Sequence, residues 1–147
     1  MGRLLDSDGL GISEAQPARA LQEKKRGLKE NWFSIAAPPE NCPGIYEWKI
    51  EGVGVYVGQA TRLASRMRAY RNNVRKIINK LPWRKGSKRE FRLVHHALRD
   101  AHDAGTPVMF SVLEICPAQL LNEREPHWID VRRAEEPKTG LKVLNSN

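Results

Sequence analysis

The chain has 147 residues and a formal net charge of +8. This length suits one domain that buries a hydrophobic core without disulfide bonds. No apolar stretch approaches the length of a membrane span, and the first residues lack a signal-peptide pattern, so we expect a soluble, cytoplasmic protein. Cys42 and Cys116 lie far apart without metal-ligand spacing, which argues against a zinc site and a disulfide framework.

The positive charge is concentrated in one segment. Residues 62–99 contain thirteen lysines or arginines and a single acid, Glu90, whereas the rest of the chain is slightly acidic. A local positive patch of this kind favours binding of a polyanion, and nucleic acid is the partner we expect. The alternative is an exposed basic helix face that binds no ligand.

Residues 1–40 are predicted to form an N-terminal extension, in which basic and acidic residues are balanced. Capping-box spacing begins at Ser13, and the apolar residues that follow permit a helix that ends before Asn31. Trp32 and Phe33 are the residues we expect to anchor this extension to the domain.

A β-hairpin is predicted next. Residues 44–50 and 53–58 both alternate with the two-residue period of a strand, and a Glu-Gly pair between them supplies the turn. Tyr46 and Tyr56 would then come close together on neighbouring strands.

A basic helix follows the hairpin. The apolar spacing is helical over Leu63–Leu81, and Pro82 ends or kinks the helix. Arg62, Arg66 and Tyr70 fall on one side of this helix, because residues four apart are neighbours on a helix surface.

The next elements are a loop, a helix, a strand and another helix. Residues 83–89 are predicted to form an exposed basic loop, and a second helix runs from Phe91 to a stop at Gly105. Val108–Ile115 is strongly strand-like, with apolar groups on both faces, as in the central strand of a sheet covered by helices. A further helical segment begins at Pro117.

The last helical segment contains a proline directly after an acidic residue. A residue before proline avoids the helical conformation, so we expect Pro126 to interrupt the helix and Glu125 to lie at a helix junction. Leu141–Asn145 is predicted to be a last strand or an extended segment.

Several of these residues are of types that occur in active sites for phosphodiester hydrolysis. The reaction needs an activated water, charge neutralisation in the transition state and a stabilised leaving oxyanion. A carboxylate that holds one Mg²⁺ or Mn²⁺, an arginine on the phosphate oxygens and a general base supply all three. A tyrosine is a base only when nearby positive charge favours its phenolate, because its reference pKa is about 10.

The ordered motifs resemble those of the GIY-YIG nucleases. Gly44-Ile45-Tyr46 matches the first motif, and Tyr56-Val57-Gly58 matches the second, with Val in place of the usual Ile. Arg66 follows Tyr56 at the ten-residue separation of the family's arginine. Tyr70 lies one helical turn later, where relatives carry His or Tyr.

The resemblance continues toward the end of the chain. Glu125, followed by Trp128-Ile129, resembles the metal-binding glutamate with its aromatic residue and isoleucine, and Asn145 matches a late Leu-Asn element. The Trp128-Ile129 pair selects Glu125 over the neighbouring Glu123. Together the motifs cover residues 42–145.

The resemblance implies a fold. We expect a small GIY-YIG-type domain of the α/β (α+β) class over residues 41–147, with a three-stranded antiparallel sheet flanked by helices. A basic stretch around residues 71–92, which contains Trp83, is longer than the family minimum and is interpreted as an insertion that contacts the substrate.

The resemblance also implies an activity, which is endonucleolytic hydrolysis of DNA with one divalent cation. Tyr56 would be the general base, with Tyr46 a positioning or alternative base. Arg66 would stabilise the transition state, and Glu125 would bind the metal. Tyr70 is the remaining catalytic candidate. Backbone or structural roles are expected for Gly44, Gly58 and Asn145.

The expected partner is double-stranded DNA, on which two copies of the chain would assemble if both strands are cut. The residues expected to contact nucleic acid are basic side chains of the first helix and the loop, with one histidine of the second helix: Arg62, Arg71, Arg75, Lys76, Arg84, Lys85, Lys88, Arg89 and His96. His95 is a second candidate to bind phosphate or assist proton transfer, with a structural role as the alternative for either histidine.

Two departures from the family pattern leave other functions open. Gln59 stands where several members place a lysine near the catalytic tyrosine, so the cation that favours the phenolate would be Arg62, Arg66 or hydrated metal. If Pro126 turns Glu125 outward, the chain would be a catalytically inactive nucleic-acid-binding module. A third possibility is an RNA-binding protein that uses the basic segment alone.

Overall fold

A computed structural model describes residues 27–29, 31–83 and 91–145. Its centre is a five-stranded mixed sheet with strand order β1-β4-β2-β3-β5. The strands are β1 (Ser34–Ile35), β2 (Gly44–Ile50), β3 (Gly54–Ala60), β4 (Val108–Ile115) and β5 (Lys142–Val143). The expected α+β class is therefore correct.

The details of the sheet differ from the expectation. β2 pairs antiparallel with both β3 and β4, but β1 joins β4 and β5 joins β3 in parallel. The predicted three-stranded antiparallel sheet is thus wrong, because two short strands from distant parts of the chain extend it at both edges. The central strand is β2 and not β4, since the outer neighbour of β4 is the two-residue β1.

The predicted hairpin is confirmed. β2 and β3 are joined by a turn in which Gly52 has a φ of 72°, a left-handed conformation that favours glycine. In the register of the hairpin Tyr46 lies opposite Gly58 and Trp48 lies opposite Tyr56. Because side chains of directly paired residues share one face of a sheet, both tyrosines lie on the same face.

Among the described residues, three helices pack against the sheet: α1 (Leu63–Ile78), α2 (Leu93–Ala104) and α3 (Leu121–Thr139), the last preceded by the 3₁₀ turn η1 (Ala118–Leu120). α1 ends before the predicted Leu81, and α2 stops as predicted at Gly105, which has a φ of 73°. In the described ranges no helix is long and apolar enough to cross a lipid bilayer.

The predicted helix junction at Glu125 is wrong. α3 continues through both Pro126 and Pro137. A proline within a helix removes one backbone hydrogen bond, and here the packing of Leu121 and Ile129 against the sheet holds the helix together.

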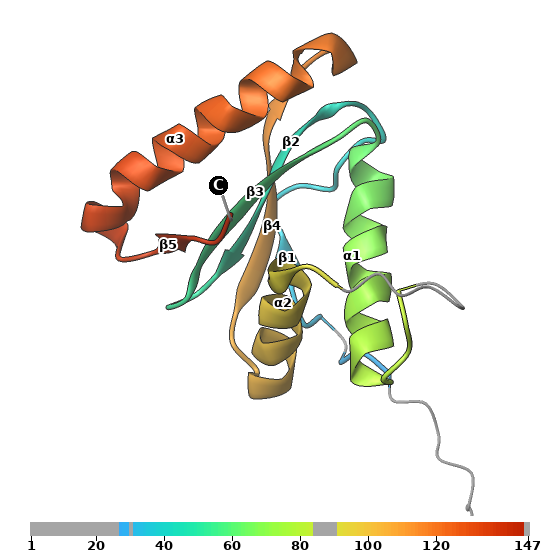
Figure 1. Ribbon diagram of the computed structural model, residues 1–147. Helices are drawn as coiled ribbons and strands as arrows, with labels where there is room; N and C mark the ends of the chain where they lie inside the picture. Colours follow the sequence, from blue (N-terminus) through green and yellow to red (C-terminus); the bar gives the residue numbers. More distant parts are fainter. Residues whose placement is uncertain (1–26, 30, 84–90, 146–147) are drawn as a thin grey trace, which may run out of the picture.

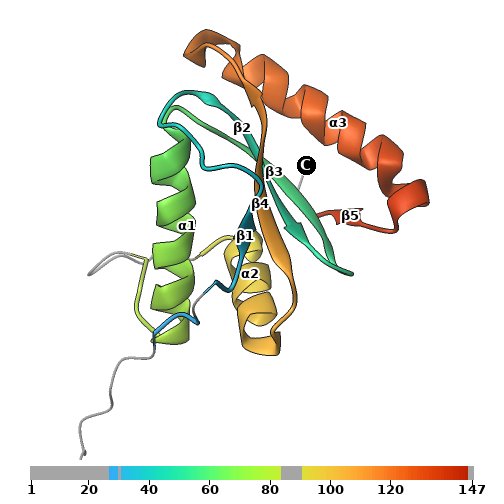
Figure 2. The same cartoon turned by 180° about the vertical axis from the view of Figure 1, so that it is seen from behind.

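The helices cover the sheet on both faces, as Figure 1 and the reverse view in Figure 2 show. α1 and α2 lie on one face, and α3 lies on the other. The alternation along β2 follows this arrangement, because Tyr46 and Trp48 belong to the cluster packed under α1 and α2, whereas Ile45 belongs to the cluster under α3.

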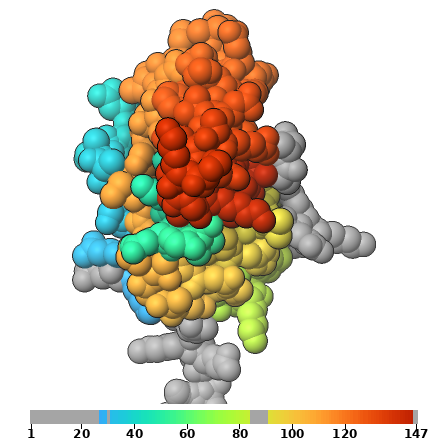
Figure 3. Space-filling view, turned by 90° about the vertical axis from the view of Figure 1, so that its left-hand side faces the viewer, coloured from blue at the N-terminus to red at the C-terminus, as the bar shows by residue number. Residues whose placement is uncertain are grey.

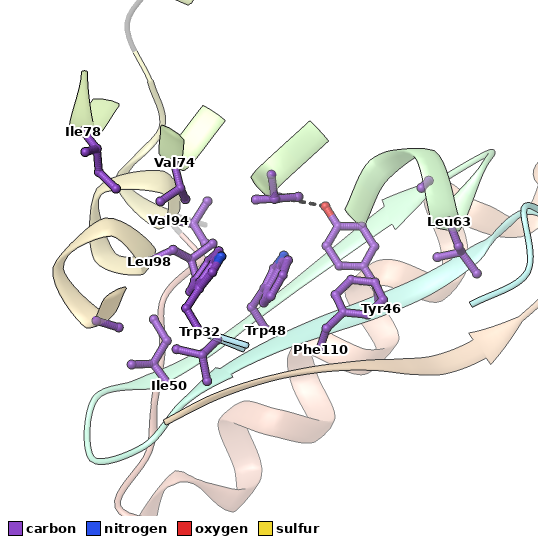
Figure 4. Close-up of a cluster of buried hydrophobic side chains, with 14 residues drawn as sticks. Trp32, Tyr46, Trp48, Ile50, Leu63, Val74, Ile78, Val94, Leu98 and Phe110 are labelled. Atoms are coloured by element: carbon purple, nitrogen blue, oxygen red, sulfur yellow. Dashed lines mark hydrogen bonds between the residues drawn. The ribbon is translucent and has the colours of Figure 1, made fainter. Parts of the chain in front are cut away.

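An aromatic cluster fills the core under α1 and α2 (Figure 4). Trp48 is completely buried, and Trp32 stacks on it with ring centroids 6.3 Å apart. Phe33 and Phe110 contact Trp48 edge-on at 5.0 and 4.9 Å. The residues expected to anchor the extension are therefore part of the core.

The boundary expected at residue 40 falls inside the folded unit, since β1 is a strand of the sheet. Before β1, the backbone N–H of Lys29 donates a hydrogen bond to His102 Nε2 at 2.9 Å, which attaches this segment to α2. Most of the helix expected before Asn31 lies outside the described residues, and residues 27–29, which the structure describes, are not helical. Of the expected insertion around 71–92, residues 71–78 belong to α1, and residues 84–90 are also outside the described ranges.

Replacing Trp32 by alanine tests this anchoring. We expect Trp32→Ala to lower the free energy of unfolding by about 3–5 kcal/mol, because it removes a buried indole from the core. Urea unfolding measures the change. Val53→Ala in the exposed hairpin turn is the control and should change stability by less than about 0.5 kcal/mol. Equal effects of the two substitutions would show that residues 31–36 are not part of the cooperative unit.

Candidate active site

The candidate site lies at an open edge of the sheet. β5 pairs with β3 only at Gly54 and Val55. Farther along β3, the side chain of Asn145 replaces a strand: its Oδ1 accepts from the N–H of Val57 at 3.0 Å, and its Nδ2 donates to the carbonyl of Val57 at 2.7 Å. The structure thus gives Asn145 a backbone-pairing role, and the short β5 leaves room for α3 to reach the edge.

All three tyrosines of the chain meet beside this edge. Tyr46 comes from β2, Tyr56 from β3 and Tyr70 from α1. The hydroxyl oxygens of Tyr46 and Tyr70 are 2.7 Å apart and share a hydrogen bond, and the ring centroids of Tyr56 and Tyr70 are 6.5 Å apart. Tyr46 and Tyr70 are buried, whereas Tyr56 is partly exposed.

Two glycines make this packing feasible. A Cβ at Gly58 would overlap the hydroxyl group of Tyr46, which crosses directly over this position. A Cβ at Gly44 would overlap the carbonyl oxygen of Glu114 on β4. At both positions the close approach of a neighbouring group, and not an unusual φ, requires glycine.

Burial separates the three phenols chemically. It raises the pKa of Tyr46 well above its usual value, and the hydrogen bond with Tyr70 and the positive charge of Arg66 only partly oppose this rise. Burial also raises the pKa of Tyr70, and the neighbouring phenols Tyr46 and Tyr56 raise it further. Tyr46 and Tyr70 are therefore protonated at neutral pH, and Tyr56 is the phenol that borders solvent.

Tyr56 borders a cleft of about 460 Å³. Its walls come from β3, the start of α2, α3 and the C-terminal segment: Tyr56, Phe91, Arg92, Leu93, Val94, Glu125, Leu144 and Asn145. Figure 3 shows α2 in yellow below the red C-terminal part of the chain, with the green tip of the hairpin between them. The cleft thus joins three side chains of catalytic type, namely a phenol, a guanidinium and a carboxylate.

Arg92 contacts the phenol directly. Its Nη1 donates a hydrogen bond to the Tyr56 hydroxyl oxygen at 3.3 Å. The negative charge that Tyr56 carries when ionised is the largest cause of a raised pKa of Arg92. No sequence motif marks this residue, which entered the prediction only as the end of a basic stretch.

Glu125 reaches the cleft from the second turn of α3. Gln59 on β3 donates hydrogen bonds from its Nε2 to Glu125 Oε1 at 2.6 Å and to Asn122 Oδ1 at 3.0 Å. The uninterrupted helix and this amide direct the carboxylate toward the cleft. Gln59 is therefore a functional candidate that the sequence analysis treated only as a missing lysine.

The carboxylate suits a hard divalent cation. In the described part of the chain Glu125 Oε2 accepts no hydrogen bond, and no group of three or more His, Cys, Asp or Glu side chains forms a metal cage. Mg²⁺ is commonly bound by one or two carboxylates together with water and substrate phosphates. The single carboxylate thus fits the predicted Mg²⁺ or Mn²⁺.

A polar network fixes α3 against the sheet. The buried Glu47 of β2 forms an ion pair with Arg132. On β4, Glu114 accepts hydrogen bonds from Arg124 at 2.8 Å and from Trp128 at 2.9 Å, and these two bonds lower its pKa. These contacts hold α3, and with it the backbone of Glu125, against the sheet.

Arg66 does not line the cleft. It is exposed on α1, and its charge lowers the pKa values of both Tyr46 and His95, which places it beside the tyrosine cluster. The Arg66 guanidinium therefore lies on the surface beside the tyrosine cluster, outside the lining of the cleft.

The residues expected to bind nucleic acid have different surroundings. Arg62, Arg71 and Arg75 are exposed on α1, and no carboxylate of a described residue pairs with them. Lys76 donates from its Nζ to the carbonyl of Trp83 at 2.8 Å and so also supports the fold. His96 is half-buried against Phe91. The other four, Arg84, Lys85, Lys88 and Arg89, lie outside the described residues.

His95 is buried and carries the structural role that was left open. Its Nδ1 accepts from the backbone N–H of Arg92 at 3.2 Å, and its Nε2 lies 3.2 Å from Asn73 Nδ2. Burial, followed by the positive charge of Arg92, lowers the pKa of His95 to about 4. The ring is therefore neutral at physiological pH.

No protein-family model matches the chain, and no curated protein or solved structure is significantly similar to it. What the cleft can do therefore follows from its geometry. A partly exposed phenol, a guanidinium bonded to it and a carboxylate with a free oxygen can together accept a proton, bind an anion and hold a cation.

The neutral state of His95 predicts a pH dependence of stability. A histidine has a pKa of about 6.5 in the unfolded chain, so its neutral form stabilises the fold above that pH. This contribution is lost as the pH falls toward 4, and it amounts to about 2 kcal/mol between pH 7 and 4.5. Urea unfolding of His95→Gln should show a pH dependence that is smaller by this amount. His96→Gln is the control, and an unchanged dependence in His95→Gln would contradict the assignment.

Proposed function

We propose that the protein is a divalent-metal-dependent endonuclease of the GIY-YIG type that hydrolyses DNA phosphodiester bonds. The observation that carries the proposal is the cleft that Tyr56 of β3 and Glu125 of α3 both line, next to the buried tyrosine pair. Titratable side chains that line one cleft are candidates for a functional site.

In this proposal Tyr56 is the general base. Its hydroxyl group borders the cleft, whereas those of Tyr46 and Tyr70 are buried and protonated. The buried tyrosines Tyr46 and Tyr70 lie on the core side of Tyr56 and position its ring. A phenolate at Tyr56 accepts a proton from water, and the hydroxide so formed attacks phosphorus in line with the leaving oxygen.

Arg66 binds the non-bridging phosphate oxygens, whose charge grows in the transition state. Glu125 would hold the cation, and Gln59 orients its carboxylate through the hydrogen bond to Oε1. A bound Mg²⁺ or Mn²⁺ supplies Lewis-acid stabilisation of the phosphate and the leaving oxygen. Asn145 keeps the backbone of β3 in place where the strand has no neighbour.

The substrate is held by phosphate contacts along α1. Arg62, Arg71 and Arg75 are exposed and have no carboxylate partner among the described residues, so their charges are available to a nucleic-acid backbone. Such contacts orient a duplex without reading its sequence. The same surface supports the second candidate function, an RNA-binding or catalytically inactive nucleic-acid-binding protein.

Removing the carboxylate tests the nuclease proposal. We expect purified protein to nick supercoiled plasmid in the presence of Mg²⁺ and to stop when EDTA is added. Glu125→Gln should reduce the rate at least about 10²-fold, because the cation loses its protein ligand, and Tyr56→Phe should do the same, because the base is lost.

The matched control is Glu123→Gln, an exposed neighbour on the same helix, which should cut at the wild-type rate. Sequencing the ends formed from duplex, single-stranded and branched substrates then gives specificity and strandedness. Absence of cutting on every substrate, or full activity of Glu125→Gln, would contradict the proposal.

Salt dependence tests the basic surface. In the Glu125→Gln background, the affinity for duplex DNA should fall steeply with salt, because each neutralised phosphate releases counterions. The double variant Arg71→Gln/Arg75→Gln should lower the slope of log K against log salt by roughly 2, if both residues contact phosphate. Fluorescence anisotropy measures this slope.

Arg99→Gln is the control, since Arg99 forms ion pairs with Asp100 and Asp103 on α2. An unchanged slope in the double variant would place DNA elsewhere on the molecule. Tighter binding of duplex RNA than of duplex DNA would favour the RNA-binding function.

A further inference from the structure

We infer that Arg92 is the cationic residue that makes Tyr56 a base, by holding the phenolate through a direct hydrogen bond in the cleft. The inference rests on the proposed function and adds a residue that none of the sequence motifs contains. It is carried by the bond from Arg92 Nη1 to the Tyr56 hydroxyl oxygen at 3.3 Å and by the cleft that both residues line.

The backbone of Arg92 is fixed. Arg92 is the N-cap residue of α2. Its carbonyl accepts from the N–H of His95 at 3.0 Å, and its own N–H donates to His95 Nδ1 at 3.2 Å. The guanidinium therefore extends from a rigid helix end toward Tyr56, which lowers the entropic cost of holding it there.

The other groups around Tyr56 do not supply this charge. Tyr46 of β2 and Tyr70 of α1 are protonated because they are buried, and His95 of α2 is neutral. Glu125 of α3 lines the same cleft, and its negative charge disfavours a phenolate.

The other positive group that acts on the tyrosine cluster is Arg66 of α1, whose charge lowers the pKa of Tyr46. No side-chain hydrogen bond joins the Arg66 guanidinium to a described residue, whereas Arg92 bonds the phenol oxygen itself. Because electrostatic interaction falls with distance, the bonded guanidinium has the larger effect on the charge of Tyr56.

The path of the proton shows at which step of the reaction Arg92 acts. Tyr56 begins as a phenolate and forms an O–H bond with the proton of the attacking water, while the new P–O bond forms and the ester P–O bond breaks. The leaving oxygen takes a proton from solvent. Tyr56 must then release its proton to solvent before the next turnover, and Arg92 favours this release.

The charge of residue 92 should therefore control the pH dependence of cutting. With Arg92→Gln, the midpoint on the acid side of the pH–rate profile should rise by about one pH unit, and the rate below it should fall about tenfold, with recovery at high pH. Arg92→Lys keeps the charge and should keep the midpoint near its wild-type position. Arg99→Gln on the same helix should follow the wild type.

A loss by the same factor at every pH in Arg92→Gln would overturn the inference and give Arg92 a phosphate-binding or structural role. Both substitutions preserve the backbone hydrogen bonds of the α2 cap, and thermal unfolding checks that the variants are folded.

A second measurement does not depend on activity. Because the chain has three tyrosines, ¹³C-labelled tyrosine gives three resonances, and Tyr56→Phe assigns one of them. In Arg92→Gln the Tyr56 resonance should titrate at higher pH than in the wild type, and an identical titration would refute the coupling. If the wild type cuts no substrate, the proposed function fails, while this titration still decides whether Arg92 stabilises the phenolate.

Discussion

The architecture of the site depends on one constraint, the short pairing between β3 and β5. A full-length fifth strand would cover the edge of β3 and keep α3 away from it. Because pairing stops at Val55, the backbone of Val57 is completed by a single side chain, that of Asn145. Gln59 can then reach α3, and a carboxylate from one face of the sheet meets a phenol from the other face.

In the tyrosine cluster, packing gives three identical side chains different degrees of burial. Tyr46 crosses over Gly58 and is enclosed by the aromatic core, so its hydroxyl is directed to Tyr70 and not to solvent. Tyr56 occupies the same face two residues before Gly58, at the boundary of the core. Burial thus keeps the two inner phenols protonated and leaves the outer phenol as the one that borders the cleft.

Local patterns made the hairpin, the stop of α2 at Gly105 and the extent of β4 predictable from the sequence, because periodicity and glycine placement act over a few residues. The parallel edge strands were not predictable, since two-residue strands have no period and their partners are far away in the chain. The path of α3 through Pro126 was missed for a related reason: tertiary packing outweighed a local preference.

The candidate site, too, was predictable only in part from the sequence. The resemblance to the GIY-YIG motifs singled out Tyr56 and Glu125, which share the cleft, but it could not identify Arg92, whose guanidinium approaches Tyr56 only in the folded chain. Gln59 was noticed as an unusual residue, and only the fold shows that it holds a carboxylate.

The opposite edge of the sheet has no comparable cover. β1 pairs with β4 only at Met109 and Phe110, so in the described chain the remaining outer backbone of β4, up to the largely exposed Ile115, has no strand partner. Free strand edges with apolar side chains are where proteins stack into oligomers and insoluble aggregates. At high protein concentration we therefore expect self-association to begin at β4, at the edge of the sheet opposite the proposed active site.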